Sequence, residues 1–304
     1  MDYDARLYIS QILLVLTSSS SASSQWCGPE GFHLVGYSLG GGLSVAFARY
    51  LPHLVRSLGL VAPCGLIRRD VHVGWRSRLL YDSFVGRCLI PGPLLRYLVG
   101  RRIRPPLPTP TPTAVKAEPA EAEIVDDGDA AGTETEAKDG EKRSQKVPRT
   151  GNSDASGGES FDGALVSLRR GPGSSGGATV SAVVRWQVDQ HAGFVGAFLS
   201  TIRCAPIYAP QGDWAALSAL LAARRQTPSD PEPTASGLRR GRVHVILGED
   251  DPVIAVHETM EDAQAVLGPD GVKLTVFPGG GHEIPMTRSA EIADALVGFW
   301  NAGT

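Results

Sequence analysis

The residues best suited to chemistry are a serine, an aspartate and a histidine that each follow a short apolar run. Ser38 comes after residues 31–36, Asp251 after residues 243–247, and His282 after residues 272–277. A serine hydroxyl becomes an effective nucleophile when an imidazole takes its proton, and a carboxylate fixes the tautomer of that imidazole. The three residue types therefore indicate nucleophilic catalysis by a Ser-His-Asp arrangement.

The surroundings of Ser38 favour a nucleophile at a sharp turn. Residues 36–40 read Gly-Tyr-Ser-Leu-Gly, between an apolar run and a helix-like run over about 40–51. Gly36 and Gly40 lack Cβ atoms, so strand and helix can approach closely. A turn serine without chemical importance is the alternative. A phosphate-binding loop is disfavoured, because the glycine spacing matches neither common phosphate-loop pattern.

The acid and the base each have an alternative. Glu249, Asp250 and Asp251 are consecutive, and any of them could cap the turn that follows the strand. Spacing favours Asp251 as the acid. His282 could be a turn histidine, but its place after the last strand favours the base. The other six histidines lack such a placement, and we expect them to be structural.

Strands alternate with helices along much of the chain, which predicts a mostly parallel sheet covered on both faces. In such a sheet, the carboxyl ends of the strands share one edge, where active-site residues collect. We expect the following elements: helix 3–18, strand 31–36, helix 40–51, strand 54–62, helices within 74–104 broken at 91–93, one or two helices in 183–202, helix 214–225, strand 243–247, helix 257–267, strand 272–277 and helix 288–300.

The predicted organisation has five parts. Residues 1–70 carry the part of the core that contains the sharp turn at Ser38, which we call the elbow. Residues 71–104 form a lid segment, 183–225 form lid and core helices, and 226–304 carry the acid and the histidine. Residues 105–182 are rich in Pro, Ser, Gly and acidic residues and have few bulky apolar ones. Such a segment cannot offset its conformational entropy by burial, so we expect a disordered insertion. A solvated insertion is favoured over a docking or phosphorylation segment.

Composition excludes several classes. The net charge of −3 gives no global reason to expect nucleic acid or an anionic membrane as a partner. The four cysteines are widely spaced and predict neither a zinc site nor a disulfide framework. Asp2 and Asp4 precede the apolar run 12–16, which argues against a signal peptide. No run is long enough to span a bilayer. We expect a cytoplasmic protein that needs no cofactor and no metal.

The chain resembles the α/β-hydrolase superfamily, specifically its AB hydrolase-1-like serine hydrolases. The resemblance rests on segments 36–41, 248–254 and 280–285, in the order serine, acid, histidine. Members carry the acid three residues after a strand-end glycine, which implies Asp251, and the histidine after a Gly-rich turn, which implies His282. The resemblance also implies that the backbone N–H of Leu39 contributes to the oxyanion hole.

The function implied is hydrolysis of an ester or similar acyl bond in a small apolar substrate. Residues 74–104 and 186–198 would form a lid and an apolar acyl pocket. Acyl transfer, thioester cleavage and C–C bond hydrolysis use the same three residues and stay open. The alternative of another class is a non-catalytic protein of this fold that binds a small apolar ligand or a partner.

One part of the superfamily pattern is missing. The resemblance implies several strands before the elbow, one of them beside the elbow strand and followed by a loop that supplies a second oxyanion donor. Only one helix and one strand precede Ser38. We therefore expect strand 31–36 to be an exposed apolar edge and catalysis to be reduced on the order of 10²–10³-fold. An incomplete gene model or truncated product would explain this. The alternative is a genuine short form that needs a partner or has lost activity.

Overall fold

The structure is a computed structural model that describes residues 2–18, 26, 28, 31–75, 77–78, 92–103, 165–166, 178–209, 212–226 and 238–302. Most of the predicted insertion 105–182 lies outside these residues, as do most of residues 19–30 and the middle of the predicted lid segment 71–104. Within the insertion, only the two-residue strands β4 (Leu165–Val166) and β5 (Ala178–Thr179) and the start of the helix that follows β5 are described.

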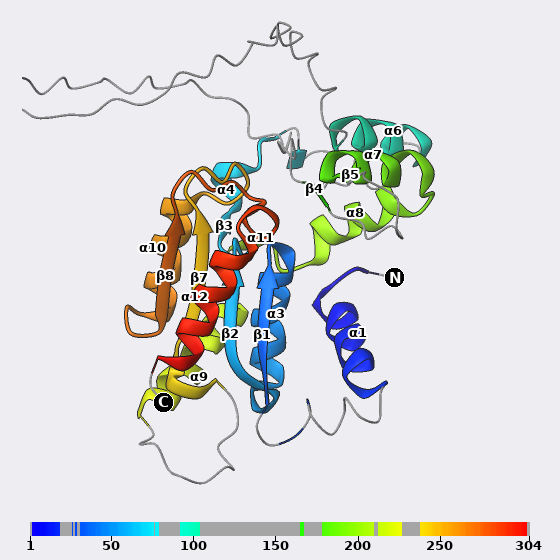
Figure 1. The fold of residues 1–304 in the computed structure, drawn as a ribbon. Helices are drawn as coiled ribbons and strands as arrows, with labels where there is room; N and C mark the ends of the chain where they lie inside the picture. The colour runs from blue at the N-terminus through cyan, green and yellow to red at the C-terminus, as the bar shows by residue number, and fades with distance from the viewer. Residues whose placement is uncertain are drawn as a thin grey trace, which may run out of the picture. The chain divides into compact units, whose positions relative to one another are not determined.

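A parallel four-stranded sheet in the order β1-β2-β7-β8 forms the centre of the fold (Figure 1). The strands are β1 (Phe32–Tyr37), β2 (Val55–Val61), β7 (Val243–Gly248) and β8 (Val272–Phe277). Each matches a predicted strand within about one residue at either end. Tyr37 lies opposite Val61, which lies opposite Ile246. This register brings the carboxyl ends of all four strands to the same edge of the sheet.

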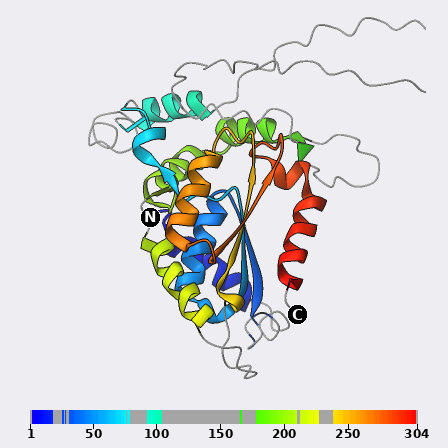
Figure 2. The ribbon, with the colours of Figure 1, turned by 90° about the vertical axis from the view of Figure 1, so that its left-hand side faces the viewer.

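Helices cover both faces of the sheet, as predicted. α3 (Leu39–Tyr50), α9 (Gly212–Gln226) and α10 (Val256–Leu267) pack on one face, and α12 (Ser289–Asn301) packs on the other (Figure 2). Phe47, Trp214 and Leu217 are fully buried on the first face. On the second face, Ile292 and Leu296 of α12 contact β2 and β7 residues. The larger apolar face is therefore the one that holds the helix after Ser38.

β1 lies at one end of this sheet, as predicted for strand 31–36. Among the described strands it pairs only with β2. Its residues alternate between half-buried and exposed positions, and Val35 is 43% exposed. α1 (Ala5–Thr17) packs near α3 and begins at Asp4, whose side chain accepts a hydrogen bond from the Leu7 N–H at 3.0 Å.

Between β2 and α9 the chain makes an excursion from the sheet. Its outgoing arm holds β3 (Ile67–Arg68) and α4 (Arg69–His72), and its return arm holds β6 (Tyr208–Ala209). β3 and β6 pair in parallel at the base of the excursion. Its longer described helices are α6 (Gly92–Ile103), α7 (Val180–Gln190) and α8 (Phe194–Cys204). α6 and α8 share a small apolar cluster around Val99.

Proline opens a helix in this excursion. α6 begins at Gly92, so Pro93 stands in its first turn, where a missing N–H costs nothing. The predicted break at 91–93 is therefore a helix start. None of the helices in the described residues is both long and apolar enough to cross a bilayer.

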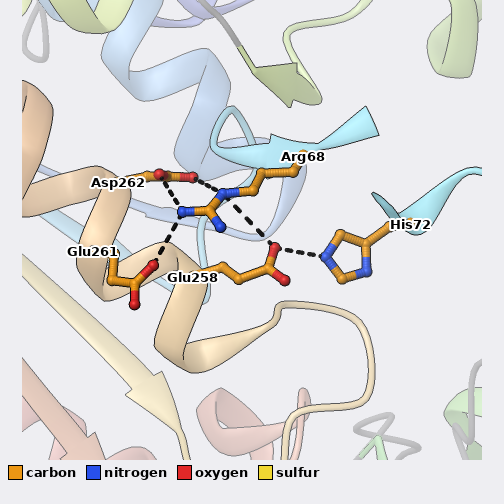
Figure 3. Close-up of polar contacts among 5 residues, drawn as sticks. All are labelled: Arg68, His72, Glu258, Glu261 and Asp262. Carbon is orange, nitrogen blue, oxygen red and sulfur yellow. Dashed lines mark hydrogen bonds and ion pairs between the residues drawn. The ribbon is translucent and has the colours of Figure 1, made fainter. Parts of the chain in front are cut away.

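Charged side chains fasten the outgoing arm to α10 (Figure 3). Arg68 donates to both carboxylate oxygens of Asp262, at 3.0 and 2.8 Å, and to Glu261 at 3.1 Å. His72 Nε2 lies 2.8 Å from the Glu258 carboxylate. These hydrogen bonds raise the pKa of Arg68 well above its usual value. We refer to Arg68, His72, Glu258, Glu261 and Asp262 as the arm network.

Candidate active site

The backbone at Ser38 adopts the strained conformation of a sharp strand-to-helix turn. Its φ is 51° and its ψ is −120°, which side-chain-bearing residues rarely adopt. Three hydrogen bonds hold it there: Ser38 N–H donates to the Val61 carbonyl at 3.0 Å, and its own carbonyl accepts from the N–H groups of Gly41 and Cys64, both at 2.9 Å. The neighbouring strand thus holds the serine in a geometry in which its hydroxyl lies 3.0 Å from His282 Nε2.

Close contacts explain why two of the positions around Ser38 are glycine, and these positions differ in part from the prediction. A Cβ on Gly36 would overlap the Gly40 carbonyl oxygen and the Ser44 hydroxyl. Gly40 itself faces open space, so the prediction that it permits the close approach is wrong. That role belongs to Gly41, where a Cβ would lie 2.6 Å from the Pro63 Cβ. Helix α3 can press against the end of β2 because position 41 has no side chain.

The structure brings the three predicted residues into one chain of hydrogen-bonding groups. His282 Nε2 lies 3.0 Å from Ser38 Oγ. His282 Nδ1 lies 2.8 Å from Asp251 Oδ2. His282 is 4% exposed, and the Asp251 side chain is fully buried. Ser38 follows β1, Asp251 follows β7 and His282 follows β8, so three separate strand ends supply the cluster.

Asp251 is oriented by the turn in which it stands. Its Oδ1 accepts hydrogen bonds from the N–H groups of Val253 and Ile254, both at 2.8 Å, which leaves Oδ2 for His282. The sequence offers capping of the turn and orientation of the histidine as alternative roles for Asp251. In the structure, its two carboxylate oxygens make both sets of contacts. Glu249 and Asp250 are exposed, and Glu249 instead accepts from the Gly279 N–H at 3.0 Å.

Two further side chains border the cluster. The Tyr37 ring lies 5.1 Å from the His282 ring, with the planes tilted by 38°. Cys64, buried at the end of β2, places its Sγ 4.0 Å from Ser38 Oγ. Sequence reasoning missed both, although Cys64 also stands just past a strand end and could have been found by the rule that selected Ser38.

Leu39, the residue expected to supply an oxyanion donor, is the first residue of α3. The opening N–H groups of a helix have no intrahelical acceptor and favour a negative charge nearby. Its placement therefore suits a developing oxyanion at the Ser38 side chain. Among the described residues, no group of three or more His, Cys, Asp or Glu side chains could hold a metal ion.

Three other histidines have hydrogen-bonding partners outside this cluster. His33 Nδ1 is 2.6 Å from Ser57 Oγ, and His72 belongs to the arm network. His244 is fully buried within β7, where its Nε2 lies 2.8 Å from Thr275 Oγ1. Burial, aided by the Lys273 charge, lowers the pKa of His244 to about 4. His244 is therefore neutral at physiological pH.

The chain belongs to the alpha/beta hydrolase fold family, whose sequence profile matches residues 27–289. That span includes Ser38, Asp251 and His282. It also includes all four strands of the central sheet. No match to a curated protein sequence was found.

Solved structures similar to this chain include a mutant of CumD, a meta-cleavage product hydrolase from Pseudomonas fluorescens IP01, at 14% identity (TM-score 0.46; 100% of this chain and 74% of that one). A structure from the thaumarchaeon Nitrososphaera gargenis, reported with carboxylesterase activity profiles, is 14% identical (TM-score 0.44; 98% and 72%). A putative lipase from Acinetobacter baumannii AYE is 12% identical (TM-score 0.42; 99% and 68%).

Proposed function

We propose that this protein is a serine hydrolase that cleaves an ester or similar acyl bond, with Ser38 as nucleophile, His282 as general base and Asp251 as the group that orients His282. The observation that carries the proposal is the pair of contacts made by His282, at 3.0 Å to Ser38 Oγ and 2.8 Å to Asp251 Oδ2. Three groups from distant parts of the chain meet in the order and at the distances that proton transfer needs.

The first chemical step follows from the hydrogen bonds. With its proton on Nδ1, His282 donates to Asp251 and accepts the Ser38 hydroxyl proton at Nε2. Ser38 Oγ then attacks the carbonyl carbon, and the imidazolium that forms is stabilised by the buried carboxylate. Because His282 and Asp251 are buried, this interaction is screened little by water.

The remaining steps use the same groups in reverse. His282 donates its new proton to the leaving group, which leaves an acyl group on Ser38. A water molecule then gives a proton to His282 and attacks the acyl carbon. The bond from that carbon to Ser38 Oγ breaks, and His282 returns the proton to Oγ, which releases the acid and restores Ser38. The N–H of Leu39, at the start of α3, stabilises the oxyanion in both halves.

We further propose that the excursion is a lid and that the acyl group is apolar. Its described parts carry large apolar side chains on the surface: Val71, Trp75, Leu94, Tyr97, Leu98 and Trp186. Apolar surface of this kind favours contact with an apolar substrate over contact with water. Hydrolysis of p-nitrophenyl esters of increasing acyl length tests this point, and equal kcat/KM for all lengths would contradict it.

A fluorophosphonate probe tests the reaction type. We expect one covalent adduct per chain on Ser38, mapped by peptide mass spectrometry, and no adduct in Ser38→Ala. Ser44→Ala is the matched control, because Ser44 is a buried serine in α3 that the mechanism does not use. A folded protein that is not labelled would favour the alternative, a non-catalytic protein that binds a small apolar ligand.

A further inference from the structure

We infer that Tyr37 is a positioning residue for His282, because its ring fixes the imidazole and stabilises the positive charge that the imidazole gains during catalysis. This inference rests on the proposed function of the Ser38 site. It adds a fourth side chain to a mechanism in which the other three are joined by hydrogen bonds.

The geometry places Tyr37 against one flank of the imidazole. The two ring centroids are 5.1 Å apart and the planes are tilted by 38°. This separation falls within the range of favourable aromatic pairs, about 4.5–7 Å. It is also inside the distance of about 6 Å within which a cation is attracted to an aromatic ring.

Tyr37 is held firmly enough to act as a support. It is half-buried and packs against the apolar clusters on both sides of the sheet, including residues of β2, β7 and α12. It is also the last residue of β1 and is covalently adjacent to Ser38. The nucleophile and the ring that supports its base therefore come from one short segment whose backbone is fixed by β2.

The other groups around His282 leave a role for this ring. Asp251 Oδ2 meets Nδ1, Ser38 Oγ meets Nε2, and the Cys64 thiol lies 4.0 Å from Ser38 Oγ. The two hydrogen bonds lie at the edge of the imidazole and do not support its flank. In a site shielded from water, the negative face of an aromatic ring favours the imidazolium over the neutral imidazole.

The first test reads the charge of His282 without requiring turnover. The ¹⁵N resonance of His282, assigned with a His282→Gln variant, is followed against pH in Tyr37→Phe, Tyr37→Leu and a protein with trifluorophenylalanine at position 37. The fluorinated ring keeps the shape of phenylalanine but loses its negative face. Relative to Tyr37→Phe, we expect the protonation midpoint to fall by about 0.4–1.5 pH units in the other two proteins.

The second test reads the reaction. For an ester substrate, we expect kcat to fall about 2- to 30-fold from Tyr37→Phe to the fluorinated protein, with KM unchanged. Tyr50→Leu, an exposed tyrosine at the end of α3, is the control and should match wild type. Equal midpoints and equal kcat in the phenylalanine and trifluorophenylalanine proteins would overturn the inference. A shifted midpoint without any Ser38-dependent hydrolysis would instead overturn the proposed function.

Discussion

Two buried histidines, one past the end of a strand and one inside a strand, differ in the polar groups that surround them. His282 stands beyond the end of β8, where a carboxylate and a hydroxyl meet its two nitrogens. His244 stands inside β7, where Thr275 meets one nitrogen and the Nδ1 atom has no hydrogen-bond partner among the described residues. Their exposures are nearly equal, at 4% and 0%.

The comparison indicates that placement, rather than burial, distinguishes the histidine that we propose as the base from a histidine inside a strand. Within a strand, the backbone is committed to the sheet, and neighbours are set by register, so His244 faces Thr275 and the Phe299 ring. Beyond a strand end, loops are free to bring polar groups from three strands together. There, the buried carboxylate of Asp251 lies 2.8 Å from His282 Nδ1.

The largest effect is expected from replacing Asp251, because this acid is present beside His282 and absent beside His244. Asp251→Asn keeps the shape of the side chain, but it has only one acceptor oxygen, which the Val253 and Ile254 N–H groups occupy. Its NH2 group then faces His282 and cannot accept a hydrogen bond from Nδ1–H. We expect kcat to fall on the order of 10⁴-fold for an ester substrate. Asp250→Asn is the matched control, because Asp250 is exposed and adjacent, and its kcat should stay near wild type. Similar losses in both variants would refute the assignment of the acid.

A smaller effect concerns the pH dependence of stability. The pKa of His244 is about 4 in the folded protein and about 6.5 when unfolded, so below pH 6.5 the unfolded chain binds the extra proton. The contribution of neutral His244 to the free energy of unfolding is fully present near pH 7 and is lost as the pH falls towards 4. Relative to His244→Gln, the wild-type free energy of unfolding should drop by roughly 2–3 kcal/mol over that range in urea titrations.

The control for this prediction is His53→Gln, an exposed histidine that should leave the wild-type pH slope unchanged. Parallel stability curves for wild type and His244→Gln would show that His244 is not held neutral. In that case, the two histidines would not differ in the way the comparison requires.

The smallest expected effect lies in the arm network, whose charges are partly exposed. Arg68→Gln removes the paired hydrogen bonds to Asp262, and half-exposed ion pairs contribute little in water. We expect amide exchange in residues 67–72 to rise by up to about fivefold at low salt, with a smaller change at high salt. Asp70→Asn is the control, because its carboxylate is almost fully exposed. Equal exchange in wild type and Arg68→Gln would show that the network does not hold the arm.

Sequence reasoning predicted the fold well because its signals are local. The apolar runs of β7 and β8 lie between polar turns, so periodicity defined both strands closely. The candidate site residues were selected by one rule, that polar side chains collect past the ends of parallel strands. Ser38, Asp251 and His282 all satisfy it, and the structure brings them together.

What sequence reasoning missed depends on contacts between distant segments. The steric demand on Gly41 comes from Pro63, and the neighbour of the Tyr37 ring is His282, more than two hundred residues away. Neither contact leaves a spacing pattern in the sequence. The dual hydrogen bonding of Asp251 was also hidden, because a capping role and a chemical role appear as alternatives until both carboxylate oxygens are placed.

The most direct test of the central claim is a double-mutant cycle on kcat/KM for a p-nitrophenyl ester, with Ser38→Ala, His282→Gln and the double variant. Residues that act as one catalytic unit are strongly non-additive. We predict that each single variant loses nearly all Ser38-dependent activity and that the double variant is no slower than either one. Losses that multiply in the double variant, or single variants that hydrolyse the ester as fast as wild type, would contradict the claim.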